Sequence, residues 1–156
     1  MEISRRKPKA SIAEVRIHPV LQQYLGYCLG KAGAIMRRNL NVAFAEYGVE
    51  AKHFAVLRVL GDSNQPNQLA IGLDMGVDKA TMVKLIDDLE AKGLVERIVD
   101  PADRRAKLIT ISRRGRGLAK TLESVRDSVE SDFLRGLSLR EKHTLRKTLT
   151  KLVGAL

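Results

Sequence analysis

The sequence predicts a mostly helical fold with a small β wing formed by one hairpin. Apolar residues recur at three- and four-residue steps over both ends of the chain, which favours amphipathic helices. Between residues 94 and 111 the period changes to two, which is typical of strands. With 156 residues, 44% of them hydrophobic, the chain has room for one domain with additional helices around a core.

Charge and composition restrict the class of partner. Lys and Arg number 28 against 18 Asp and Glu, a formal net charge of +10 that favours a polyanion. Only 4% of residues are aromatic and none is Trp, so stacking on single strands is disfavoured and duplex DNA is expected. No apolar run is long enough to span a bilayer, and the single cysteine excludes an internal disulfide. We therefore expect a cytoplasmic protein that binds no membrane.

The N-terminal third is expected to form a basic arm followed by one long helix. The first ten residues carry four Lys or Arg and almost nothing apolar, so residues 1–18 are interpreted as a solvated arm. Pro19 is tolerated in the first turn of a helix, and apolar residues spaced by three and four follow it. The pattern predicts a helix over residues 19–48, ending near Gly48.

Two short helices are expected after a second helix and a polar loop around Pro66. The first covers about residues 67–73, and the second begins at Asp78 after a tight turn. Asp78 is predicted to cap the second helix through the N–H of Thr81, and Gly93 supplies a left-handed exit. One side of this helix is apolar and the other is polar, so one side packs and the other is presented.

The last part of the chain is predicted to form the hairpin and two further helices. The strands lie on either side of a basic turn at residues 100–105. Apolar residues at 118, 122, 125, 129 and 133 and at 145, 149, 152 and 156 predict the two helices. Ser138 and Glu141 form a capping box at the start of the second.

Residues 49–112 therefore follow the order of a winged helix-turn-helix domain. A helix about as wide as the major groove presents small and basic side chains, while the hairpin reaches the flanking backbone or minor groove. At this point the sequence resembles the MarR family of bacterial transcriptional regulators over about residues 20–156. The residues that carry the likeness are Gln68-Leu69-Ala70, residues 77–90 (VDKATMVKLIDDLE), 92–95 (KGLV), 100–105 (DPADRR) and 109–115 (ITISRRG).

The resemblance implies a homodimer that binds pseudo-palindromic operators and is often released by a small phenolic or acyl ligand or by oxidation. Residues 19–48 and 113–156 would then be dimerisation helices on either side of the DNA-binding domain. The family places a wing arginine in the minor groove, held by a carboxylate two residues earlier, which here are Arg105 and Asp103. The full set of expected DNA contacts is Lys79, Ala80, Thr81, Lys84, Asp103, Arg104, Arg105 and Arg113.

One feature conflicts with a simple basic patch. Residues 78–93 hold three Lys against four acidic residues, so the helix expected to enter the groove has a net charge of −1. Asp87 and Asp88 lie near its C-terminal end and are assumed to point away from phosphate. If Asp88 instead faces DNA, it either accepts from a cytosine amine or repels the backbone.

The family's effector pocket lies between the first two helices and the winged domain. An anionic effector would suit Arg37 or Arg38, although each candidate also has a plain packing or solvent role. Cys28 lies on an apolar stripe and is expected to pack there, because the two tyrosines of the peroxide-sensing branch are replaced by Ala51 and Phe54. The candidate effector residues are Tyr24, Tyr27, Arg37, Arg38, His53 and Phe54.

The leading hypothesis is a ligand-responsive repressor with an operator, a second copy of itself and an anionic or aromatic effector as partners. The alternative is a basic protein that coats DNA without sequence preference. An enzyme ranks third, because the sequence has no phosphate loop, nucleophile elbow or paired-His motif. The three histidines are far apart in sequence, so no metal site is expected. No cofactor and no catalytic residue are expected either.

Overall fold

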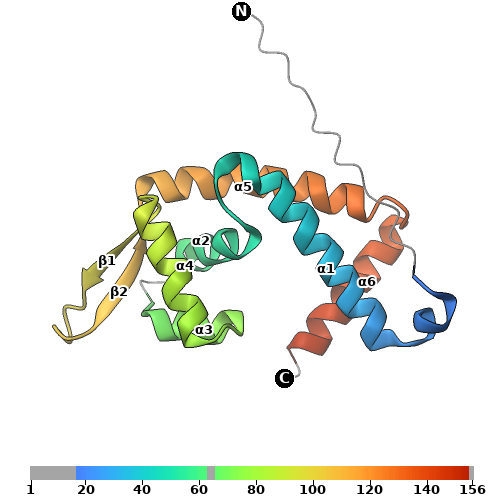
Figure 1. Ribbon diagram of the computed structural model, residues 1–156, viewed down its shortest axis with the longest axis horizontal. Helices are drawn as coiled ribbons and strands as arrows, with labels where there is room; N and C mark the ends of the chain where they lie inside the picture. Colours follow the sequence, from blue (N-terminus) through green and yellow to red (C-terminus); the bar gives the residue numbers. More distant parts are fainter. Residues whose placement is uncertain (1–16, 63–65, 155–156) are drawn as a thin grey trace, which may run out of the picture.

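The computed structural model describes residues 17–62 and 66–154, and it is mainly helical with one two-stranded sheet (Figure 1). Residues 1–16 of the arm expected over residues 1–18, and the terminal Leu156, lie outside this part of the chain. No described helix is long and apolar enough to cross a membrane. In chain order the elements are η1 Pro19–Gln23, α1 Leu25–Phe44, η2 Ala45–Tyr47, α2 Ala51–Asp62, α3 Gln68–Met75, α4 Lys79–Ala91, β1 Val95–Val99, β2 Lys107–Ile111, α5 Arg113–Phe133 and α6 Leu139–Val153.

The first helix is interrupted, so the prediction of one helix over residues 19–48 was wrong at its start. Pro19 opens a 3-10 turn whose first N–H donates to the His18 ring at 3.3 Å. Such turns seldom continue, and Tyr24 leaves helical geometry with φ −101° and ψ 106°. The α-helix begins only at Leu25, and a short 3-10 turn extends its end to Gly48, which takes a left-handed φ of 70°.

Helices α2, α3 and α4 enclose the core of the molecule. Their fully buried side chains include Leu57, Ile71 and Ile86, and Phe44 joins them from the end of α1. The Asn41 side chain accepts the N–H of Ala51 at 2.8 Å, which fixes the start of α2 against α1. Helix α3 runs two residues further than predicted because Gly76, at φ 60°, supplies its left-handed cap.

The predicted hairpin is confirmed, with β1 antiparallel to β2. Val95 pairs with Ile111, and Arg97 pairs with Ile109. Ile109 and Ile111 face the core, whereas Val99 is 56% exposed because the hairpin extends beyond the helices (Figure 1). The wing is therefore anchored at its base and projects at its tip.

Helix α5 begins against the loop that follows α4. Ser112 caps it by accepting the N–H of Gly115 at 2.9 Å, and the Ser112 hydroxyl donates to the Gly93 carbonyl at 2.8 Å. A Cβ on Gly115 would lie 2.1 Å from the Leu94 carbonyl oxygen, so only glycine permits this approach. The close contact fixes the start of α5 relative to the end of α4.

The two C-terminal helices form as predicted, including the capping box of Ser138 and Glu141. Their apolar stripes do not have a single role. Leu122 is buried and Leu118 and Val125 pack on the subunit's own core, whereas no described residue of α6 is buried. The expectation that the whole α5 stripe serves a shared interface is therefore corrected, since its first half packs within the subunit.

Candidate nucleic-acid interface

Helix α4 presents a polar stripe that begins at its N-terminus. Lys79, Ala80 and Lys84 are exposed. Asp78 caps the helix, because its carboxylate accepts the Thr81 N–H at 2.9 Å and the Thr81 hydroxyl at 2.6 Å. The hydroxyl and backbone hydrogen bonds from Thr81 lower the pKa of Asp78 below its ordinary value, so the cap stays ionised. The Thr81 hydroxyl proton is thus engaged in the cap and only its lone pairs remain to accept.

The acidic residues of α4 are paired within the molecule. Asp87 and Glu90 both bind the guanidinium of Arg97 on β1, and the Arg97 Nη2 to Asp87 Oδ1 distance is 2.5 Å. Asp88 pairs with Lys92 on the same helix and with His53 of α2. Burial opposes the charge of Arg97, but the hydrogen bonds that its guanidinium donates to Asp87 and Glu90 outweigh burial and raise the pKa of Arg97. These contacts offset the negative charge that the sequence places on α4.

His53 is a buried link between α2 and α4. Its Nδ1 accepts the N–H of Glu50 at 3.0 Å, and its Nε2 lies 3.1 Å from Asp88 Oδ2. Nε2 therefore carries the proton of a neutral ring. Burial lowers the pKa of His53, although the charges of Asp88 and Glu50 act in the opposite direction. Both nitrogens are engaged internally, so the ring is not presented to an effector.

The wing tip is organised by two aspartates that hold the main chain. Asp100 accepts the N–H of Ala102 at 2.8 Å, and Asp103 accepts the N–H of Arg105 at 2.9 Å. The expectation that Asp103 holds the Arg105 side chain is corrected, since its carboxylate holds the backbone instead. Within residues 17–62 and 66–154, neither Arg104 nor Arg105 forms an ion pair, and both are exposed.

Arg113 is exposed at the first position of α5, close to the base of the wing. Its place follows from the preceding residue, because Ser112 hydrogen-bonds to Gly93 and to the Leu94 carbonyl. Arg114 and Arg116 are exposed on the same turn. A basic cluster thus adjoins the C-terminal end of α4, a position that sequence periodicity alone does not give.

In the part of the chain that the structure describes, the six expected effector residues have different surroundings. Tyr24 is 61% exposed at the break before α1, whereas His53 is buried and Phe54 packs against Phe44 with tilted rings whose centroids are 5.4 Å apart. Arg37 and Arg38 line a shallow surface pocket of about 500 Å³ that also includes Asn41 and Val42 of α1. The separation arises because the first helix is long and its two ends lie beside different parts of the fold.

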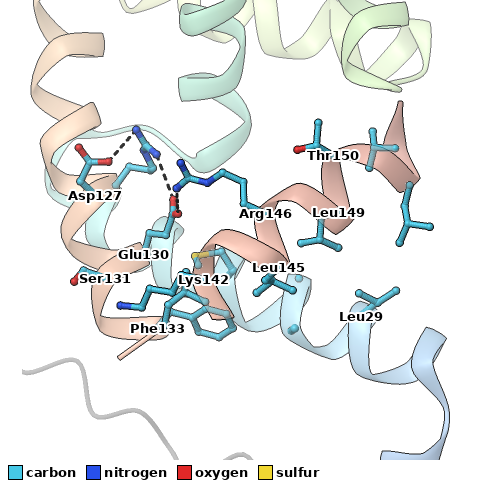
Figure 2. A pocket seen from close by; sticks show the side chains of 17 residues that line it. Leu29, Asp127, Glu130, Ser131, Phe133, Lys142, Leu145, Arg146, Leu149 and Thr150 are labelled. Carbon is cyan, nitrogen blue, oxygen red and sulfur yellow. Dashed lines mark hydrogen bonds and ion pairs between the residues drawn. The ribbon is translucent and has the colours of Figure 1, made fainter. Parts of the chain in front are cut away.

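Sequence reasoning missed a groove between α1, α5 and α6. Its volume is about 850 Å³, and its lining is mostly apolar (Figure 2). Arg126 binds Asp127 and Glu130 on one wall, and Arg146 of α6 reaches Glu130 at 3.3 Å. The apolar periodicity of the three helices was the available signal. The apolar lining includes Leu29, Met36, Phe133, Leu145 and Leu149.

Cys28 is half-buried rather than fully packed, and its thiol lies 3.5 Å from the carbonyl of Gln22. The break at Tyr24 folds η1 back beside it, which the prediction of a continuous helix did not allow. The part of the chain that the structure describes holds no group of three or more His, Cys, Asp or Glu suited to a metal ion.

Comparison with known proteins matches these features. The model of the MarR family matches residues 47–106. An HTH-type transcriptional repressor of Mycobacterium tuberculosis is 28% identical over 128 residues, which cover 82% of this chain and 92% of the relative.

Two solved structures share the fold. CouR from Rhodococcus jostii RHA1, bound to p-coumaroyl-CoA, is 29% identical with a TM-score of 0.75, covering 86% of this chain and 95% of that one. A transcriptional repressor CouR bound to a 23-mer DNA duplex has a TM-score of 0.81 at 23% identity, covering 88% and 99%. Residues 47–106 thus match the MarR family model, and the chain is similar in sequence and fold to winged helix-turn-helix transcriptional regulators of that family.

Proposed function

We propose that the chain is a ligand-responsive repressor that binds a pseudo-palindromic operator as a homodimer in the cytoplasm and has no catalytic role. One observation carries this proposal. The exposed stripe of α4 and the basic wing tip belong to one folded unit, and the acidic side chains Asp87, Asp88 and Glu90 of α4 are already paired within it. In this proposal residues 49–112 contact DNA, and the apolar side chains that residues 19–48 and 113–156 leave exposed hold the dimer together.

The proposed docking places α4 in the major groove. Lys79, Ala80 and Lys84 face base edges and phosphate, and the Thr81 oxygen accepts at the helix N-terminus. Arg104 and Arg105 then reach the flanking phosphate and minor groove, where the potential is most negative. Asp103 acts through the backbone by shaping the wing turn, and Arg113 contacts phosphate. A repressor of the same fold, CouR, is bound to a 23-mer DNA duplex, which supports duplex DNA as the partner.

A second copy of the chain is proposed to fill the groove between α1, α5 and α6. A 15-residue helix with no buried residue gains little stability by itself, so α6 needs a partner surface. The exposed apolar side chains that line the groove provide one, and they include Leu29, Leu145, Leu149 and Leu152. For both α4 helices to enter successive major grooves, the dimer must hold them about 34 Å apart.

We also propose that a small anionic or aromatic effector weakens operator binding by favouring a dimer with a different spacing of the two α4 helices. The CouR from Rhodococcus jostii that holds p-coumaroyl-CoA supports this class of ligand. Arg37 and Arg38 are the candidate anion contacts. Tyr24 and Tyr27 are the candidate aromatic contacts, and they lie near the opposite, N-terminal end of α1. Replacing either arginine should abolish release but leave operator binding intact, and unaltered release would remove the assignment.

The test is sequence preference. Duplexes enriched by selection from a random pool are compared with unselected duplex at fixed salt by fluorescence anisotropy. A repressor predicts a preference of about 10³ or more, whereas a DNA-coating protein predicts a ratio near one. The second result would replace the proposed function with its alternative.

A further inference from the structure

Arg97 joins the wing to helix α4. It lies on β1, yet its guanidinium spans two carboxylates of α4, Asp87 and Glu90, which are one turn apart. Glu90 binds Arg97 twice, because its second oxygen accepts the Arg97 backbone N–H at 3.2 Å. The Arg97 side chain is only 19% exposed, so these contacts are less screened by water than ordinary surface ion pairs.

The geometry of the sheet explains why this contact matters. β1 pairs with β2 on one side only, so every second N–H of β1 points away from its partner strand. Glu90 accepts a hydrogen bond from the backbone N–H of Arg97 at this open edge, and Asp87 accepts one from the guanidinium of Arg97. The side chains of α4 thus hold both the main chain and the side chain of the same wing residue.

We call the contacts of Arg97 with Asp87 and Glu90 the tie, and its position on α4 relates it to the exposed stripe. Asp87 lies three residues after Lys84, so both face the same side of the helix. Arg97 lies near the middle of β1, and the strand leads directly into the wing tip with Arg104 and Arg105. A change in the tie would therefore change the separation between Lys84 and Arg105.

We propose that Arg97 is a positioning residue for DNA recognition, which ties β1 to Asp87 and Glu90 and thereby holds Arg105 in register with the α4 stripe. The proposal rests on the proposed function and identifies a residue outside the expected contacts. Arg97 does not touch DNA in this account. It acts by limiting the orientations of the wing, so that Arg105 loses less freedom on binding.

Two variants break the tie with opposite changes of charge. Arg97→Gln removes a cation, and Asp87→Asn combined with Glu90→Gln removes two anions. Simple attraction to phosphate predicts weaker binding for the first and tighter binding for the second. Positioning predicts that both bind a selected operator about tenfold more weakly, because the wing is released in each case.

The experiment measures what Arg105 contributes in each background. Arg105→Ala should weaken operator binding about tenfold or more in the wild-type background. It should cost less than about threefold in Arg97→Gln and in the Asp87→Asn, Glu90→Gln variant, because the wing is no longer held in place. Equal costs in all three backgrounds, or tighter binding by the double variant, would overturn the proposal.

A matched control and a DNA-free measurement complete the design. Arg58→Gln breaks the 3.7 Å pair with Glu123 between α2 and α5, which involves no residue of the hairpin, and should change neither affinity nor the cost of Arg105→Ala. Hydrogen exchange of amides 100–106 should be faster in both tie-breaking variants and unchanged in Arg58→Gln. Unchanged exchange in the tie-breaking variants would also overturn the proposal.

The two proposals fail in different ways. If the wild type shows no preference for selected duplex, or if Arg105→Ala costs nothing in the wild-type background, the proposed function or its wing contact fails. The hydrogen-exchange comparison then still decides whether Arg97 orders the wing. If Arg105→Ala is costly and that cost does not depend on Arg97, only the positioning role fails.

Discussion

At the scale of single residues, His53 shows how burial determines a protonation state. Its Nδ1 must stay unprotonated to accept the Glu50 N–H, and its pKa is lowered from the ordinary value of 6.5. In the unfolded chain the ring binds a proton more readily than in the folded state. The contribution of the neutral His53 ring to the free energy of unfolding is therefore fully present above pH about 6.5. It is lost as the pH falls toward the lower pKa of His53 in the folded protein.

His53→Gln should remove this pH dependence. We expect the free energy of unfolding of the wild type to fall between pH 7 and pH 5 more steeply than that of the variant, as measured by urea denaturation across that range. His143→Gln, which changes an exposed ring on α6, is the control and should keep the wild-type slope. Equal slopes for wild type and His53→Gln would contradict the assigned protonation state.

Gly115 is a second residue whose role depends on its surroundings. Its ideal Cβ would lie 2.1 Å from the Leu94 carbonyl oxygen, so Gly115→Ala should destabilise the fold by about 3 kcal/mol. Gly117→Ala is the matched control, because nothing lies within 4 Å of a Cβ there. The control should raise stability by about 0.5 to 1 kcal/mol through helix propensity. A similar effect of both changes in thermal unfolding would contradict the close approach.

At the scale of elements, the caps and periods of the sequence predict most helices and both strands. Asp78, Gly93 and the Ser138 capping box act locally, so neighbouring residues are enough to identify them. The break at Tyr24 and the pairing of Arg97 with α4 were not predicted. Both depend on contacts between segments that fold together, which periodicity along the chain does not report.

The wing as an element is expected to contribute to operator binding through its two exposed arginines. Arg105→Ala should weaken operator binding by about 1 to 3 kcal/mol, and Arg104→Ala should reduce the salt slope of binding by about one unit. Titrations at several salt concentrations measure both quantities. Wild-type affinity and salt response in both variants would contradict the assignment of the wing to DNA.

At the scale of the whole molecule, the exposed groove beside α6 predicts an obligate pair. Leu149 lines the groove at 37% exposure, and Leu149→Glu would place a charge in the proposed interface. We expect this variant to sediment as a monomer at micromolar concentration and to lose operator binding. Lys147→Glu changes an exposed α6 residue outside the groove lining and should remain dimeric. A dimeric Leu149→Glu variant would contradict the interface.

The effector site marks the limit of prediction from sequence. Arg37 and Arg38 share a surface pocket, but Tyr24, His53 and Phe54 lie elsewhere in the fold. Residue type identifies groups able to bind an anion or an aromatic ring. Their arrangement depends on how the long helices pack, which residue type does not report.

Site-directed cleavage of bound operator tests the central claim most directly, that α4 and the wing act together on duplex DNA. A chelated iron is attached at Ala102→Cys on the wing and, separately, at Ala80→Cys on α4, each in a Cys28→Ala background. The account predicts two cleavage zones symmetric about the operator centre from each position, with the wing zones outside the helix zones. Cleavage from only one position, or cleavage spread evenly along the duplex, would contradict it.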